Sequence, residues 1–460
     1  MNTQRRYLMN LALALLAGLC WIPANGTHAA ETGWRCGVAT AKITPAKHLW
    51  MGGFAARTKP AEGTLDDLWV KVLALETPGN IGVVITTDLV GIPKWLYDSL
   101  CTRLGASHGL SRSQVLIANS HTHSGPVLRD ALQDIYPLDD ALRALSAEYS
   151  SWLEDVIVKT VGEALARRSP ATLCAGEGKA TFAVNRRTNN ERELPALLAR
   201  GEKPKGPSDF AVPVLAVRAA DGRLRAVLFG YAAHTSTLNG YKWSADYAGY
   251  ARRWLEMKHA GVETLFFQGC GSDQSAAPRG TLEQCMGMGE SLGAAVQTVL
   301  EKPMRQLQPK LRTAHEFVPL DFGEQPTKAE LEKLATAKSY EARWARRLLK
   351  ELEAGRAFAK GYAEYPVQVW RLGLDQLWIT QGGEVCVDYA LMHKTKHGAG
   401  TWVAGYANDV MAYIPSRRLW EEGGYQAGAF AVYGLPAKRW TPEIEKLICA
   451  AVARLVEKVR

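Results

Sequence analysis

The chain lacks the features that would place it outside the ordinary globular class. Its 460 residues contain no low-complexity tract, no internal repeat and no linker rich in proline and serine. The composition, 47% hydrophobic and 22% charged, is typical of globular proteins. We therefore expect one large α/β domain with insertions rather than a string of small domains.

Cysteine is scarce and widely scattered. One of the eight cysteines, Cys20, lies in the N-terminal segment, which leaves seven, and no two of these form a C-x-x-C pair. An odd number without close pairs argues against a disulfide framework, and we expect one or two bridges at most. The same spacing argues against a zinc site built from thiolates.

Positive charge is in modest excess and is not concentrated. The net charge is +9, and part of it lies in the segment "EARWARRLLKELEAGR", which has the pattern of a solvated amphipathic helix. No basic cluster is interleaved with aromatic residues, so we expect no nucleic-acid partner.

Long apolar runs are absent except at the N-terminus. Within residues 1–30, Arg5 and Arg6 lie near the start, an apolar stretch runs from Leu8 to about Ile22, and small residues follow. This pattern is typical of a secretory signal peptide and too short for a membrane span. The two arginines also suit a twin-arginine signal. We expect an exported protein, periplasmic or extracellular, with no transmembrane segment and a mature chain covering residues 31–460.

Short apolar runs alternate with helical patterns along the rest of the chain. Seven runs predict strands, several of them buried on both faces: "VKVLALE", "IGVVITTD", "VLIAN", "VPVLAVRA", "LRAVLFGYAA", "TLFFQG" and "LWITQGG". Helices are predicted after Ser244, from Thr441 onward, and over a charged insertion from about Thr327 to Phe358. The pattern predicts an α/β fold: one large mixed sheet with flanking helices and a helical insertion.

Polar residues gather where four of these predicted strands end, in "NSHTHSGP", "HTSTLNG", "CGSDQS" and "GEVCVDY". Strand ends that meet at one edge are the usual place for a site in α/β folds. On extended backbone, His121 and His123 point the same way and face one centre. His234 and Glu384 follow two other strands. The sequence therefore predicts a site at the strand ends.

These residue types are those of a metal site. Two or three imidazoles with one carboxylate are a common catalytic zinc set, with one position left open for water. Two histidines and a carboxylate also hold iron in some enzymes. Each histidine alone is equally consistent with a hydrogen-bonded core residue or a loop residue. We predict zinc, and spacing alone does not decide whether the residues meet.

Several segments, in order, resemble the catalytic domain of neutral ceramidases, a neutral/alkaline, non-lysosomal family of zinc amidases. They are "NSHTHSGP", "YAAHTST", "FFQGCGSDQS", "QGGEV" and "ANDVMAYIPS", followed by "GGYQAG". The opening "CGVATAKITPA", with "MGGFAAR" and "AVNRRTNN", follows the same pattern, so the resemblance runs from about Trp34 almost to the end.

The resemblance implies a catalytic domain over residues 31–460 that hydrolyses the N-acyl amide bond of ceramide or a similar N-acyl lipid through metal-activated water. Familiar ceramidases carry an additional C-terminal immunoglobulin-like domain, which we do not expect here because the chain ends soon after its last helix. The alternatives are a related metal hydrolase acting on a different amide or ester, and a non-catalytic relative. The implied partner is a small-molecule or lipid substrate. We expect the protein to contact a membrane surface only transiently.

Carried over residue by residue, the metal ligands of the family fall on His121, His234, Glu384 and Tyr413. Tyr413 is the least specific of the four. Relatives often carry two tyrosines in this segment, whereas Val410 stands at the earlier position here. Tyrosine is also a common packing residue.

The reactive serine of the family maps to Ser275 in "SDQSAA". Here Ser272 replaces the glycine of the family motif G-D-x-S-P-N, and two alanines replace its Pro-Asn pair. These changes remove features of a well-aimed nucleophile turn, so we favour attack by water with Ser275 in support; a nucleophilic serine is the alternative.

The resemblance implies further roles for three residues. We expect His123 to hydrogen-bond the attacking or departing oxygen or to move a proton, the alternative being that it only orients the site. Tyr425 is predicted to donate a hydrogen bond to the oxyanion. Arg186 is predicted to anchor a polar or anionic substrate group.

Overall fold

A computed structural model describes residues 33–460, so the predicted signal peptide and Cys20 lie outside the described residues. Its main feature is a nine-stranded mixed sheet. Only β4 with β5 and β9 with β11 pair in parallel; the other neighbours are antiparallel. Across the sheet the strands run β11 (Glu263–Gln268), β9 (Leu224–Tyr231), β8 (Ala211–Ala219), β6 (Ser169–Lys179), β1 (Trp34–Lys42), β3 (Trp69–Thr77), β4 (Asn80–Thr87) and β5 (Val115–Asn119), with β13 (Arg305–Leu307) beside β6.

A second sheet of four strands packs against the inner face of the large one. Its strands are β14 (Leu311–Asp321), β15 (Gly361–Leu372), β16 (Gln376–Gln381) and β18 (Trp402–Ala404). Leu73 and Leu75 of the large sheet share one buried core with Trp370 and Trp378 of the small one. Large aromatic side chains fill the space between the sheets, so this interface is dry.

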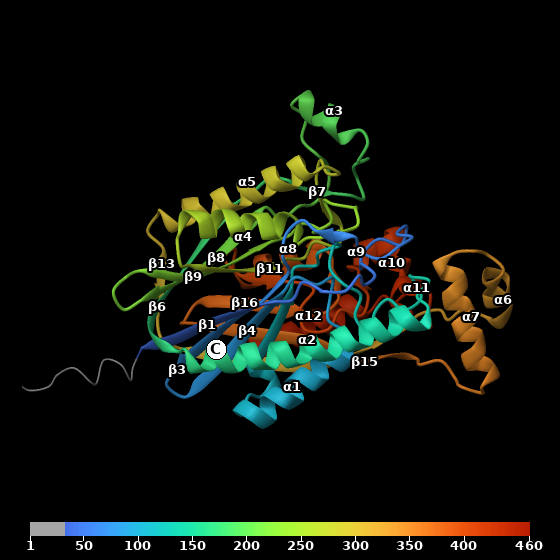
Figure 1. The fold of residues 1–460 in the computed structure, drawn as a ribbon, viewed down its shortest axis with the longest axis horizontal. Coiled ribbons are helices and arrows are strands. Elements are labelled where there is room, and N and C mark those ends of the chain that lie inside the picture. The colour runs from blue at the N-terminus through green and yellow to red at the C-terminus, as the bar shows by residue number, and fades with distance from the viewer. Residues whose placement is uncertain (1–32) are drawn as a thin grey trace, which may run out of the picture.

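Helices cover the outer face of the large sheet. Val72 and Ala74 alternate with Leu73 and Leu75 along β3 and pack under α1 (Lys94–His108) and α2 (Asp140–Ala166). At the other end of the sheet, α4 (Asp246–Lys258) and α5 (Leu282–Leu300) pack on the same face. Figure 1 shows the two helix pairs on opposite sides of the molecule, so the sheet is strongly curved. This double burial explains the continuous apolar runs in the sequence.

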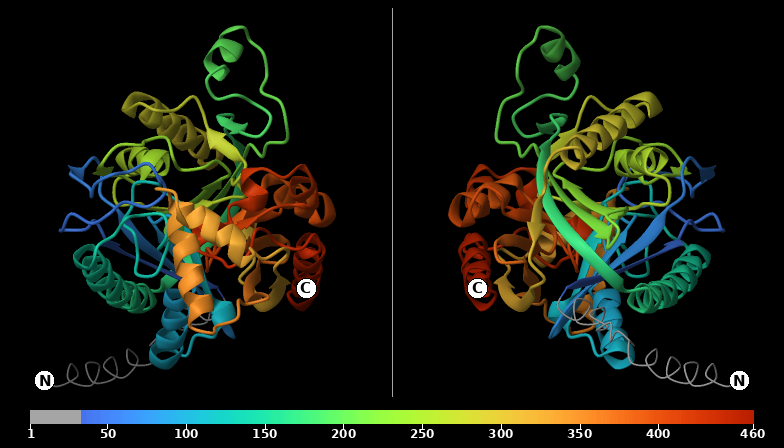
Figure 2. Two further views of the ribbon diagram at one scale, coloured as in Figure 1. Left: turned by 90° about the vertical axis from the view of Figure 1, so that its right-hand side faces the viewer. Right: turned by 90° about the vertical axis from the view of Figure 1, so that its left-hand side faces the viewer.

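The face of the small sheet that points away from the large sheet is covered by α8 (Val387–His397) and α12 (Ile444–Lys458). The helix predicted from Thr441 begins at Ile444 instead, with Pro442 in the preceding turn. The predicted insertion forms two helices, α6 (Lys328–Ala335) and α7 (Tyr340–Glu353), because Ser339 caps a new helix. Figures 1 and 2 show this pair and α3 (Leu194–Ala199) projecting from the body of the protein.

Short elements build the region around the strand ends. They are β2 (Gly63–Thr64), β7 (Ala183–Asn185), β10 (Lys242–Trp243), β12 (Gln274–Ala276), β17 (Glu384–Val385), β19 (Tyr413–Ile414), the 3-10 helix at Arg112–Gln114, α9 (Arg417–Glu422), α10 (Tyr425–Gly428) and α11 (Phe430–Tyr433).

All seven predicted strands are present, as β3, β4, β5, β8, β9, β11 and β16, and the mixed α/β fold is confirmed. The seven cysteines of the described residues are free. None of the helices within residues 33–460 has the length and apolarity needed to span a bilayer.

The curvature of the large sheet brings its two edges toward each other. Strands β5 and β11 lie at opposite edges of the sheet. The segment after β18 bridges them, because Ala407 pairs with Ala118 of β5 and Ala404 pairs with Gly269, which follows β11. As a result, the loops after β5, β9, β11 and β16 meet in one place.

Candidate metal centre

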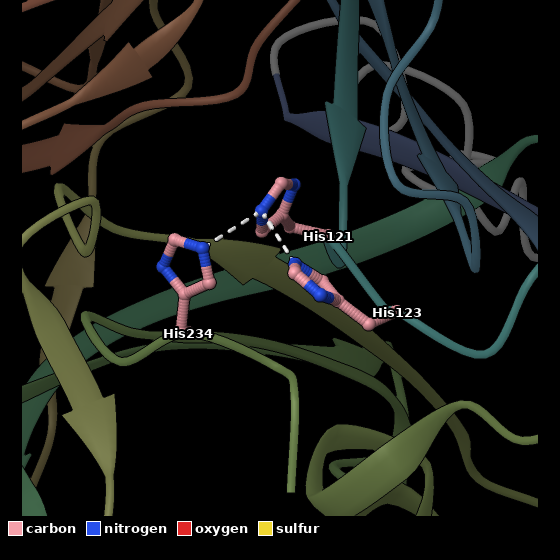
Figure 3. Close-up of side chains that lie close together, drawn as sticks. All are labelled: His121, His123 and His234. Carbon is pink, nitrogen blue, oxygen red and sulfur yellow. Dashed lines mark hydrogen bonds between the residues drawn. The ribbon is translucent and has the colours of Figure 1, made fainter. Parts of the chain in front are cut away.

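Four electron-pair donors converge at these strand ends. The Nε2 atom of His121 lies 3.2 Å from Nε2 of His234 and 3.2 Å from Nε2 of His123 (Figure 3). Oε2 of Glu384 lies 3.4 Å from the first of these nitrogens and 3.3 Å from that of His234. All four side chains are buried. The sequence pattern placed these residues after strands without deciding whether they meet, and the structure brings them together.

The hydrogen-bond partners of His121 and His234 indicate which ring nitrogens keep a free lone pair. Nδ1 of His121 lies 2.6 Å from the carbonyl oxygen of Val90, and Nδ1 of His234 lies 2.9 Å from that of Gly271. A nitrogen this close to a carbonyl donates, and a neutral imidazole carries only one N–H. The two Nε2 atoms therefore present lone pairs to each other. Oε2 of Glu384 is buried and has no hydrogen-bond partner among the described residues.

Lone pairs packed this closely repel unless a cation lies between them. Three imidazole nitrogens and one carboxylate oxygen form a donor set typical of zinc. The Nδ1 contacts with backbone carbonyls are the usual way in which a protein orients metal-binding histidines. The residues therefore fit a metal ion, with His121, His123, His234 and Glu384 able to hold it.

The local backbone differs from the extended conformation that was expected after β5. His121 has φ of 57°, in the left-handed region that non-glycine residues rarely adopt. The side chains of His121 and His123 thus converge because the chain turns sharply, and not because they alternate on a strand. Such strain persists where surrounding contacts over-determine the conformation, and functional sites are where it concentrates.

Hydrogen bonds between loops hold the two histidine segments together. Oγ1 of Thr235 donates to the carbonyl oxygen of Ser120 at 2.6 Å, and the backbone N–H of His123 donates to the carbonyl of Thr235 at 3.0 Å. Arg57, which is buried, donates from Nη1 to the carbonyl oxygen of His123 at 2.6 Å. The loop after β5 is therefore fixed to the loop after β9.

Glu384 reaches the cluster from the short strand that follows β16 of the second sheet. It lies on β17, which pairs in parallel with β19, so that Glu384 stands opposite Tyr413. The pairing needs Gly383, whose φ is +70° and whose position leaves no room for a Cβ beside the carbonyl of Ala412. The hydroxyl of Tyr433 donates to Oε1 of Glu384. Oε1 is thus occupied, and Oε2 remains free for an ion.

Burial and nearby arginines favour the neutral forms of His123 and His234. Burial lowers the pKa of His123 well below its usual value, and the positive charges of Arg57, Arg186 and Arg279 act in the same direction. Burial also lowers the pKa of His234 well below 6.5. Neutral imidazoles are the metal-binding form.

A cavity of about 230 Å³ opens onto the cluster. His121, His123 and Glu384 line it, together with three further residues predicted from the sequence, Arg186, Tyr413 and Tyr425. Nη2 of Arg186 lies 3.4 Å from the hydroxyl of Tyr413. The side chain of Tyr425, on α10, is 52% exposed and stands at the mouth of the cavity.

Ser275 does not line this cavity. It lies on β12, where its backbone forms a bridge with that of His234, and its side chain is buried. The structure therefore places the serine beside the histidine that was assigned to the metal and outside the lining of this cavity.

Three site residues were missed in the sequence. The ring of Tyr406 lies 4.2 Å from that of His121, centroid to centroid, and its hydroxyl is 3.4 Å from Nδ1 of His234. The hydroxyl of Tyr433 donates a hydrogen bond to Glu384, and Arg279 lines the cavity. Tyr406 precedes the resembling segment "ANDVMAYIPS" by one residue, and nothing in its pattern distinguishes it from a core aromatic.

The fold and the buried cluster define a class: a mixed α/β protein with a candidate metal centre at the strand ends. No protein-family model matches the chain, and no curated protein matches its sequence. Among solved structures, a ceramidase complexed with C2 is similar over 92% of this chain and 76% of its own, with a TM-score of 0.68 and 18% identity. The neutral ceramidase from Pseudomonas aeruginosa is similar over 93% of this chain and 74% of its own, with a TM-score of 0.68 and 19% identity. The chain therefore has the fold of neutral ceramidases, as the sequence segments predicted.

Proposed function

We propose that this protein is an exported, zinc-dependent amidohydrolase of the neutral ceramidase type, which hydrolyses the N-acyl amide bond of a small-molecule or lipid substrate. The observation that carries the proposal is the convergence of His121, His123, His234 and Glu384 within a ceramidase fold. A donor set that includes two or more imidazole nitrogens favours zinc over harder cations such as magnesium.

A zinc ion at this centre would lower the pKa of a water to about 7 and polarise the substrate carbonyl. The residues around it have complementary tasks. His123 lines the cavity beside His121 and is suited to take a proton from the attacking oxygen and return it to the departing nitrogen. Arg186 and Tyr425 line the cavity and are suited to donate hydrogen bonds to the oxygen that gains negative charge.

Water is the proposed nucleophile. Ser275 lies on β12 and is not among the residues that line the cavity, and we therefore favour a supporting role over covalent catalysis. Its backbone bridge to His234 is suited to keep that imidazole in place. Tyr413 is the proposed fourth protein ligand beside His121, His234 and Glu384, and its position opposite Glu384 supports this role.

Export is proposed from residues 1–30 alone, because they have the pattern of a secretory signal peptide. Cell fractionation of the tagged protein tests this part separately. Recovery in the cytosol at full length would contradict it.

The test of function combines metal content with turnover. Purified protein is expected to contain about one zinc per chain by elemental analysis and to release fatty acid from N-acyl substrates. Chelation should abolish the activity, and added zinc should restore it. Fatty-acid release that persists in metal-free protein would contradict the proposal.

A further inference from the structure

A second cavity of about 280 Å³ adjoins the candidate metal centre. The two cavities share Phe54, Ser236 and Arg279 in their walls. The second cavity is lined in addition by Arg57, Glu191 and Tyr241. Because three residues line both cavities, the two cavities lie side by side.

The charges around the two cavities do not balance. Arg57, Arg186 and Arg279 line them, whereas the acidic lining residues are Glu191 and Glu384 only. Glu384 faces the metal cluster. Glu191 forms a two-point ion pair with Arg279. Two positive charges therefore remain without an acidic partner.

The hydrogen bonds of these arginines confirm the imbalance. Arg57 donates only to backbone carbonyl oxygens, those of Gly52, His123 and Gly240, which satisfy its N–H groups but do not neutralise its charge. Nε of Arg186 is buried and has no partner, and no carboxylate in residues 33–460 forms a salt bridge with this side chain. A buried cation without an anion is costly unless a ligand supplies the negative charge.

Part of the lining of the metal cavity is apolar. Leu132, Ile135 and Val432 line it, with Tyr340 from the first turn of α7, and these residues belong to one hydrophobic cluster. None of the four lines the second cavity. Of the two cavities, the four apolar or aromatic residues thus line the metal cavity alone, whereas Arg57 lines the second cavity and Arg279 lines both.

We propose, building on the function proposed above, that the preferred substrate is an N-acyl amino acid, with its acyl chain against Leu132, Ile135 and Val432 and its carboxylate toward Arg279 and Arg57. In such a molecule the carboxylate is joined to the amide nitrogen through one carbon, so it reaches the adjoining cavity while the carbonyl stays at the metal centre. The second cavity, lined by Arg57, Arg279 and Glu191, keeps one positive charge in excess for such a carboxylate. Water adds across the amide bond: the acyl carbon gains the hydroxyl and the nitrogen gains the proton, which releases a fatty acid and an amino acid.

The experiment compares matched substrates. Release of dodecanoate is measured for N-dodecanoylglycine, for N-dodecanoylglycinamide, which lacks the negative charge, and for a short-chain ceramide. The expected kcat/KM is at least about 10-fold higher for the carboxylate than for its amide, as one charge-assisted hydrogen bond provides. Equal or better turnover of the uncharged compounds would overturn the inference and leave the proposed hydrolase function standing.

Two variants should move the preference in opposite directions. Arg279→Gln removes a positive charge and leaves Glu191 unpaired, so the ratio of kcat/KM between the carboxylate and its amide should fall about 10-fold or more. Glu191→Gln frees the donors of Arg279, so the ratio should rise. Arg454→Gln is the matched control, because Arg454 also contacts one glutamate, Glu316, at the surface. An unchanged ratio in both site variants would contradict the inference.

Failure of every substrate to react would count against the hydrolase function but would still leave a binding test. Calorimetric titration of the wild-type protein should then show tighter binding of N-dodecanoylglycine than of its amide, with the difference lost in Arg279→Gln. Equal binding of both ligands to the wild-type protein would overturn the inference by itself.

Discussion

The Nε2 atoms of His121 and His234 lie 3.2 Å apart although the two residues are separated by 113 positions in the chain. Both imidazoles direct Nδ1 at a backbone carbonyl, that of Val90 in one case and that of Gly271 in the other. The tautomers are therefore set by main-chain atoms, and both free lone pairs point at the same centre. This relationship is the basis of the predictions that follow.

Removal of one imidazole should release the metal. His121→Ala is expected to reduce bound zinc at least about 10-fold, because a direct ligand contributes no less than the outer partners that orient it. Elemental analysis of the purified variant is the measurement. His108→Ala, at an exposed histidine on α1, is the matched control. A full equivalent of zinc in the His121 variant would remove this residue from the ligand set.

His123 is predicted to act on protons rather than as a required ligand. His123→Ala should keep most of the zinc and lower turnover about 100-fold, as loss of a general acid or base does. Zinc content and kcat are measured on the same preparation. The structure makes this a sharp test, because Nε2 of His123 is as close to His121 as that of His234 is. A parallel fall in zinc and activity would make His123 a ligand.

Ser275 distinguishes two mechanisms. If water attacks, Ser275→Ala should lower kcat by no more than about 10- to 100-fold, comparable to the loss of one or two hydrogen bonds. Deletion of a catalytic serine costs far more, on the order of 10⁴-fold or greater. Mass spectrometry during turnover gives a direct answer, because an acyl adduct on Ser275 would establish covalent catalysis whatever the mutant rates.

Gly53 is predicted to set the position of His123. Its φ is +96°, and a Cβ at this position would overlap the imidazole of His123. Gly53→Ala should therefore reduce kcat in addition to destabilising the fold. The control is Gly222→Ala, where φ is +85° and no atom lies within 4 Å of the added carbon. That variant should lose about 1 kcal/mol of unfolding free energy from backbone strain and retain its activity. Equal kcat in the two alanine variants would contradict the role of Gly53.

Tyr433 is predicted to tune the affinity for metal. Its hydroxyl donates to Oε1 of Glu384 and leaves Oε2 free. Tyr433→Phe keeps the ring and removes this hydrogen bond, so the affinity for zinc should fall about 10- to 100-fold, as for other partners of metal ligands. Competition with a chelator of known affinity measures the change. Tyr362→Phe is the control, because this tyrosine donates to Asp409 instead. Unchanged affinity in the Tyr433 variant would show that the hydrogen bond does not tune the site.

Much of the fold was predictable because the strands are buried on both faces. Runs such as "VKVLALE" and "IGVVITTD" are continuous and apolar, and the structure shows helices on one side of them and the second sheet on the other. Polar residues directly after such strands stand out for the same reason. His121, His234 and Glu384 were therefore recognisable as candidates before their positions were known.

The sequence by itself determined the strands, the polar residues that follow them and the resemblance to neutral ceramidases. Only the tertiary structure decided that these residues meet, because the meeting depends on the curvature of the large sheet and on the bridge from Ala404 and Ala407 to its two edges. Tertiary packing also decided that Tyr433 holds Glu384 and that two arginine charges remain unbalanced beside the cavity. Contacts of this kind join residues far apart in the chain, and the local pattern of side chains contains no record of them.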